Sequence, residues 1–199
     1  YLIAQNGDPR KVEVATAQKY FAIQTRRMEL SDQQAADMER LELRQQAKES
    51  FKALSGAARK SGVQNAMFGI FRDAGYRGMY GCGVDRIREI KGIGSNEQLL
   101  DRAGATDLAA NNFRMTQTTD KLARENVRDQ QVAIRTHEEV GREVRKAIQQ
   151  IGGTLPEAEP AAEHIRIVEK RVKKSKPKIA LTQEHATGLL PPPLTADDL

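Results

Sequence analysis

The spacing of apolar residues most constrains how this chain can fold, because it follows the helical period over long stretches. In the segments 9–56, 106–126 and 127–151, apolar residues recur three, four or seven positions apart, which places them on one face of an α-helix. Alternation of period two, which a half-buried strand requires, is confined to the isolated stretch 164–172. We therefore expect an all-α protein, an irregular multi-helix bundle with long N-terminal helices and a disordered C-terminal tail.

The first long segment is expected to contain two helices. Asp8-Pro9 can begin the first helix, because Asp caps helix starts and Pro is tolerated at the first helical position. Ser31 is followed by Gln34 in capping-box spacing, which predicts a break and a second helix start. The buried face of this second helix is expected to comprise Met38, Leu41, Ala47, Phe51 and Leu54.

The middle of the chain is expected to be broken by glycine. Residues 63–71 are predicted to be helical, and residues 75–83, with the sequence GYRGMYGCG, to form a bent connection. Two short helices are then predicted at 85–92 and 96–104. The two longer helices that follow should bury Leu108, Phe113 and Leu122 in the first, and Val132, Val140, Val144, Ile148 and Ile151 in the second.

The composition changes after Gly153, where a Gly-Gly pair ends the last predicted long helix. Six of the seven prolines lie beyond this point, among charged and small residues that cannot bury a core. We expect a helical domain at 31–155 and a Pro/Lys-rich, largely disordered tail at 156–199. The first residues, YLIAQNGDP, resemble the end of an element already under way, so we expect an upstream part.

The charge and the single cysteine give weaker indications. The chain carries 32 Lys and Arg against 27 Asp and Glu, a net charge of +5, which permits phosphate binding but does not require it. One cysteine cannot form an internal disulfide and indicates a reducing compartment. No stretch has the roughly 20 apolar residues that span a bilayer. We expect a cytoplasmic protein without a membrane partner.

The residues that could carry catalysis or bind a metal lack the required spacing. His137-Glu138 resembles the start of a zinc-protease helix, but Gly141 stands where the second histidine is needed. We therefore expect His137 to be solvated or partly packed. Cys82 lies between two glycines, with no base nearby in the sequence to activate it. We expect no catalytic residue, no metal, no cofactor and no small-molecule substrate.

Residues 87–94 resemble the hairpin of a helix-hairpin-helix DNA-binding motif. In such a hairpin, backbone N–H groups near glycines and the next helix N-terminus hold a phosphate. Under this hypothesis, Gly92, Gly94 and Ser95 face the phosphate. Gln98 stands where a small packing residue is usual, so a plain turn between two short helices is the alternative.

Four blocks of sequence resemble a bacterial family. Residues 1–27 are similar to the closing segment of a Bro-N domain, found in phage antirepressor-like proteins. Residues 75–81 followed by IREIKGI, then 96–122 and 136–160, resemble the all-helical C-terminal part of the DNA-damage-inducible protein D family, in the same order and spacing. The resemblance assigns residues 1–30 to the end of a Bro-N-like domain, most of which is not in this chain.

The resemblance also implies a function. Members of this family are expected to be non-enzymatic proteins of the bacterial DNA-damage (SOS) response. They would modulate recombination by binding DNA or the RecA–DNA filament, and a homo-oligomer is one expected state. The alternative is a phage-type antirepressor or transcription regulator, in which helices bind a protein partner.

Two polar sets are candidates for contact with nucleic acid or a partner. The first combines cations with amides that can hydrogen-bond phosphate or bases: Arg26, Arg27, Asn111, Asn112, Arg114, Gln117, Lys121 and Arg124. For each of these residues, the alternative is that it caps a helix or bridges helices in the core. The second set is a basic run that could add flexible phosphate contacts or simply be solvated: Arg171, Lys173, Lys174, Lys176 and Lys178.

Overall fold

A computed structural model describes residues 12–175, with side chains described from residue 18 onward. The chain divides into two compact units, Tyr1–Glu39 and Arg40–Leu199. The described residues form helices and turns and contain no strand, so the all-α prediction is confirmed. The predicted helix start at Asp8-Pro9 lies outside the described residues.

The first described helix, α2 (Val12–Lys60), runs without interruption. The predicted break at Ser31 is therefore wrong. A serine alone does not end a helix, and no glycine or proline occurs between Val12 and Ser55 to do so. Within the first unit, α2 exposes several large apolar side chains, including Met38, which was expected to be buried: Tyr20, Ile23, Met28, Leu30 and Met38.

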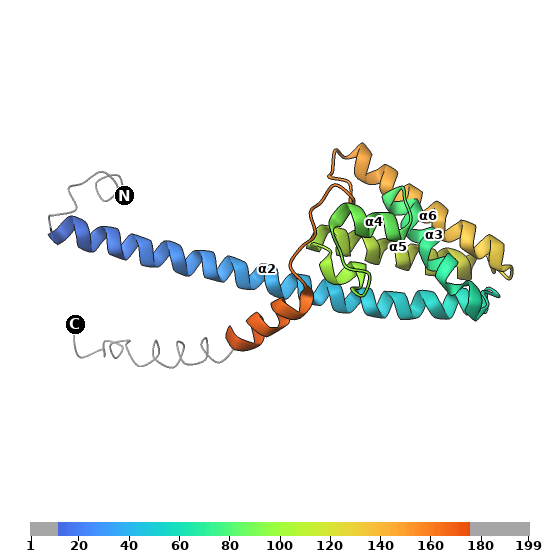
Figure 1. The fold of residues 1–199 in the computed structure, drawn as a ribbon, viewed down its shortest axis with the longest axis horizontal. Helices are drawn as coiled ribbons and strands as arrows, with labels where there is room; N and C mark the ends of the chain where they lie inside the picture. Colours follow the sequence, from blue (N-terminus) through green and yellow to red (C-terminus); the bar gives the residue numbers. More distant parts are fainter. Residues whose placement is uncertain (1–11, 176–199) are drawn as a thin grey trace, which may run out of the picture. The chain divides into compact units, whose positions relative to one another are not determined.

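The second unit contains the remaining elements (Figure 1). They are η1 (Asn65–Met67), α3 (Phe68–Tyr80), α4 (Val84–Lys91), η2 (Leu99–Arg102), α5 (Ala105–Arg124), α6 (Gln130–Gln150) and a helix at 165–175. Two predictions for the middle of the chain are wrong. The stretch 75–83 is not a bent connection, because α3 continues through Tyr80 and turns only at Gly81, with φ +73°. In place of the helix predicted at 96–104, the structure has only the single turn η2.

Glycines inside α3 permit a close approach to α6, the helix against which α3 packs most extensively. A Cβ at Gly78 would overlap the backbone oxygen of Glu138, and a Cβ at Gly75 would overlap the side chain of His137. From the other side, a Cβ at Gly141 would lie 2.9 Å from the Gly75 oxygen. Only hydrogen in place of Cβ fits at this crossing.

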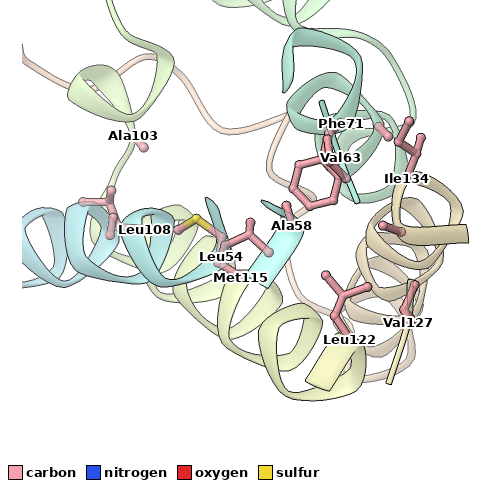
Figure 2. Close-up of a cluster of buried hydrophobic side chains, with 13 residues drawn as sticks. Leu54, Ala58, Val63, Phe71, Ala103, Leu108, Met115, Leu122, Val127 and Ile134 are labelled. Atoms are coloured by element: carbon pink, nitrogen blue, oxygen red, sulfur yellow. The ribbon is translucent and has the colours of Figure 1, made fainter. Parts of the chain in front are cut away.

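The main core joins the second half of α2 to α3, α5 and α6 (Figure 2). The helical spacing correctly predicted the burial of Ala47, Leu54, Leu108, Leu122 and Val144. Besides Met38, the same spacing was wrong for four residues that are exposed: Phe51, Phe113, Val132 and Ile151.

The segment predicted to begin the disordered tail is partly folded. The guanidinium of Arg145 binds Glu157 through two contacts of 2.8 and 2.5 Å, and the Ala162 N–H donates to the Arg102 carbonyl at 2.8 Å. The helix at 165–175 then buries apolar residues spaced three and four apart, namely Ile165, Val168 and Val172. This short apolar stripe was missed because the prediction relied on composition, and charged residues surround the three apolar ones. The folded body thus extends at least to residue 175, and residues 176–199 lie outside the described part of the chain.

Candidate nucleic-acid interface

Two of the predicted binding residues, Asn111 and Arg114, lie in the core. Asn111 Nδ2 donates to Tyr80 Oη and to Asp107 Oδ1, both at 2.9 Å. Arg114 Nη2 donates to Asn111 Oδ1 at 2.9 Å. Both side chains are buried and cannot contact a nucleic acid, so the binding prediction is wrong for these two residues. The alternative, that they bridge helices in the core, is confirmed.

This buried network continues at both ends. Asp107 accepts from Lys91 Nζ at 3.1 Å and from the Tyr80 hydroxyl at 2.5 Å. At the other end, Arg114 contacts His137 Nε2, and His137 Nδ1 bonds the Phe71 carbonyl at 2.9 Å. Burial lowers the pKa of His137 well below its usual value, and the charge of Arg114 lowers it further. His137 is therefore neutral and fully packed, contrary to the expectation of a solvated or partly packed side chain.

Three other predicted residues meet on the surface. Gln117, Lys121 and Arg124 line a groove of about 320 Å³ formed by α5 and α6, which also contains Glu139 and Glu143. Lys121 pairs with Glu139 at 3.1 Å, and Arg124 pairs with Asp120 at 2.5 Å. Because carboxylates balance its cations, this groove has little net attraction for phosphate.

The remaining members of the first predicted set are separated from these three. Asn112 is half-buried and donates to the Leu43 carbonyl at 3.1 Å. Arg26 and Arg27 belong to the first unit, where both are exposed and Arg26 pairs with Glu29 at 3.3 Å. Of this set, the structure therefore brings together at one surface groove only Gln117, Lys121 and Arg124.

The basic run is partly visible on the helix at 165–175. Arg171 is exposed and pairs with Glu163 at 2.7 Å. Lys173 and Lys174 are exposed on the same helix. Lys176 and Lys178 lie outside the described residues. The described part of the run is thus a solvated helix face.

The stretch that resembled a DNA-binding hairpin is a plain turn. Gly92 ends α4 in the left-handed conformation, with φ 63°. Gly94 and Ser95 are exposed, and the Glu97 N–H donates to the Gly94 carbonyl at 3.0 Å. The next helical element is η2, a 3₁₀ turn of four residues. The described residues therefore have a 3₁₀ turn where the motif needs its second α-helix, so the hairpin prediction is wrong.

A different site stands out in the second unit: a cleft of about 340 Å³ that we call the cationic cleft. Residues from α2, α3, α4, η2 and the turn before η2 line it: Arg44, Ala47, Lys48, Phe51, Arg72, Tyr76, Val84, Arg88, Gln98, Leu99 and Leu100. Four of these side chains are cationic, and no carboxylate is among them. This composition attracts anions.

The four cations differ in how far they are neutralised. Arg44 is buried and pairs with Asp101 at 2.7 Å. Arg88 reaches the largely solvated Asp85 at 3.3 Å, and its buried Nε has no partner within the described part of the chain. Lys48 and Arg72 are exposed, with no ion pair among the described residues. These last two leave positive charge uncompensated in the cleft.

Two aromatic side chains accompany the cations. Phe51 is 41% exposed, whereas Tyr76 is 8% exposed. The buried Arg114 guanidinium lies 5.4 Å from the centre of the Tyr76 ring and so helps to hold it. Burial raises the pKa of Tyr76, so its hydroxyl stays protonated and can donate a hydrogen bond. The cleft thus combines cationic side chains with aromatic rings.

The sequence patterns did not lead to this site. Arg44, Lys48 and Phe51 stand four and three residues apart on one face of α2, a signal that was available. Phe51 was instead assigned to the core because it continues the apolar stripe. Arg72 and Arg88 join the site only through the packing of α3 and α4, which no local pattern reveals.

The remaining chemically distinctive residues form no such group. In the region that the structure describes, no three His, Cys, Asp or Glu side chains are placed to hold a metal ion. Burial raises the pKa of the half-buried Cys82 thiol, which favours its protonated form. None of the described helices is long and apolar enough to cross a membrane.

Comparison with known proteins agrees with the resemblance seen in the sequence. The model of the DinD C-terminal domain family matches residues 34–168. The chain is also similar to DNA damage-inducible protein D of Escherichia coli (strain K12), with 48% identity over 182 residues, covering 87% of this chain and 66% of that protein. The chain thus spans slightly less than two thirds of the length of that relative. No solved structure matches the chain. The Bro-N resemblance of residues 1–30 precedes the family match and stays a prediction. The chain belongs to the DinD C-terminal domain family.

Proposed function

We propose that this chain is part of a bacterial DNA-damage-response protein that acts by binding rather than by catalysis. The damage-response role is supported by the 48% identity to DNA damage-inducible protein D. The partner is DNA or a RecA–DNA filament in the cytoplasm, and binding there modulates recombination.

The cationic cleft is the observation that carries the DNA-binding part of this proposal. Lys48 and Arg72 are exposed and without ion pairs in the described chain, and Arg88 adds a partly compensated third charge. Cations of this kind displace the counterions condensed on a nucleic acid and gain free energy by doing so. The α5–α6 groove lacks this property because its own carboxylates balance it.

Fluorescence anisotropy with labelled DNA tests the proposal directly. The double variant Lys48→Ala/Arg72→Ala should bind about tenfold more weakly or worse, since each cation that neutralises a phosphate strengthens binding. A matched control is Arg142→Ala/Lys146→Ala, which removes two exposed cations from α6 outside the cleft. Equal weakening in both double variants would show that net charge, and not the cleft, governs binding.

The filament part of the proposal requires its own assay. RecA filaments assembled on DNA are mixed with this chain, and their disassembly is followed over time. The proposal expects the wild-type chain to change the disassembly rate and the cleft double variant to have a weaker effect. No effect of the wild-type chain would remove the filament as a partner of this part of the protein.

One observation favours a second candidate function, helix-mediated binding to a protein, as in a phage-type antirepressor. The α2 residues of the first unit leave Tyr20, Ile23, Met28 and Leu30 between 44% and 68% exposed, and exposed apolar patches mark protein-interaction sites. Such a partner would bind with DNA absent and with weak dependence on salt. DNA binding through the cationic cleft would instead weaken steeply as salt rises.

A further inference from the structure

We infer that the cationic cleft selects single-stranded DNA over duplex DNA, holding one phosphodiester while one base stacks on Phe51. This inference rests on the proposed function and names the form of DNA that the site takes. It follows from the size of the cleft, from its aromatic lining and from the kind of hydrogen-bonding groups it presents.

The size of the cleft suits a single nucleotide. A volume of about 340 Å³ is near the lower end of the range of sites that enclose small organic molecules, roughly 300–1,000 Å³. In a duplex the bases are paired and stacked, so a concave pocket on a protein meets only the sugar-phosphate surface. A single strand can turn one base outward into such a pocket.

The aromatic lining would be of little use for a duplex. Phe51 keeps 41% of its surface exposed at the cleft, although an apolar ring gains nothing from contact with water. Successive bases of single strands stack on such rings, and this stacking tolerates any base because each has a π-face. Tyr76 also lines the cleft, with the Arg114 guanidinium 5.4 Å from the centre of its ring, and adds a second, more buried aromatic ring.

The polar lining consists mainly of donors. Lys48 and Arg72 can reach phosphate oxygens, and the buried Arg88 Nε–H has no acceptor within the described chain. The Gln98 amide oxygen is already used by Arg44, at 2.9 Å. A donor-rich site suits phosphate oxygens and base carbonyl oxygens such as those of thymine. We therefore take oligothymidylate as the probe.

The first experiment compares three probes of equal length, each about 20 nucleotides so that it exceeds the usual site size. They are oligothymidylate, a duplex and an oligomer of abasic phosphodiesters. Oligothymidylate should bind about tenfold tighter than either of the others, because only it offers a free base for stacking. Equal affinity for oligothymidylate and the duplex would overturn the inference and leave the proposed function standing. Failure of all three probes to bind would instead remove the DNA-binding part of the proposed function.

Substitutions at Phe51 provide the second experiment. Phe51→Ala should weaken oligothymidylate binding about tenfold and so remove the preference for oligothymidylate over the duplex, whereas Phe51→Tyr should keep that preference. The matched control is Phe113→Ala, since Phe113 is also an exposed phenylalanine, 57% exposed on α5, and lies outside the cleft. The Phe113→Ala variant should bind oligothymidylate as tightly as the wild-type chain does. Equal weakening in Phe113→Ala and Phe51→Ala would show that the cleft does not bind a base. A competition experiment gives the same test: if polyglutamate displaces oligothymidylate as well as a DNA competitor of equal charge does, the cleft binds charge and no base.

Discussion

Gly78 on α3 faces the backbone carbonyl of Glu138 on α6 so closely that a Cβ on Gly78 would overlap that oxygen. The obstruction is backbone and cannot rotate away, unlike the end of a flexible side chain. The crossing of α3 and α6 therefore depends on glycine at this position, and this crossing supports both the buried polar network and the cleft residues of α3.

Gly78→Ala should destabilise the fold by about 3 kcal/mol or more, because the two helices must separate to admit the methyl group. Gly56→Ala is the matched control: Gly56 lies inside α2, and a Cβ there would meet nothing within 4 Å. That control should gain about 0.5–1 kcal/mol from its higher helix propensity. Urea unfolding of both variants measures the difference, and equal stabilities would contradict the close crossing.

His137 should make stability depend on pH. Its pKa in the folded chain is well below 6.5 because it is buried next to Arg114, so below about pH 6.5 only the unfolded state takes up the proton. The free energy of unfolding should then fall by about 1.4 kcal/mol for each pH unit below that value, and this contribution is fully present above it. Denaturant unfolding between pH 7.5 and about pH 5 should show this slope. The slope should be absent from His137→Gln, and an unchanged slope in that variant would rule out the assignment.

The ion pair of Lys91 and Asp107 should be expensive to break. Both side chains are at most 2% exposed, with Nζ and Oδ2 3.1 Å apart. Lys91→Ala would leave the Asp107 carboxylate buried without its cation, which should cost about 3–5 kcal/mol. The exposed pair of Arg86 and Glu89 supplies the control, since Arg86→Ala should change stability by less than about 1 kcal/mol. Thermal or urea unfolding that ranks the two variants equally would count against the buried pair.

The helix at 165–175 should contribute to the stability of the folded body. Val168 is 1% exposed, whereas its neighbour Ile167 is 50% exposed. Val168→Ala should cost about 2 kcal/mol through the reduced burial and the cavity left behind, and Ile167→Ala should change stability by about 0.5 kcal/mol or less. An unchanged stability in Val168→Ala would show that this segment does not pack on the folded body and would support the disordered tail predicted from composition.

The sequence predicted the helices better than their ends and their surroundings. Leu108 and Leu122 could be placed in the core because residues at multiples of seven positions lie on one face of a helix, whichever helices pack against it. Gly75 and Gly78 were misread as turn residues, since their role depends on α6, a helix distant in the sequence. Asn111 and Arg114 are polar and lie on a helix, which is also true of surface residues, and only the partner groups Tyr80 and His137 explain their burial. The cationic cleft escaped prediction for the same reason.

The central claim, that the chain acts by binding phosphate in the cationic cleft, is tested most directly by the salt dependence of DNA binding. The logarithm of the affinity of the wild-type chain for oligothymidylate is plotted against the logarithm of salt concentration. For Lys48→Ala/Arg72→Ala the slope should become shallower by about 1.4, or about 0.7 for each single-strand phosphate that is no longer neutralised. A slope identical to that of the wild-type chain would show that Lys48 and Arg72 touch no phosphate and would contradict the account.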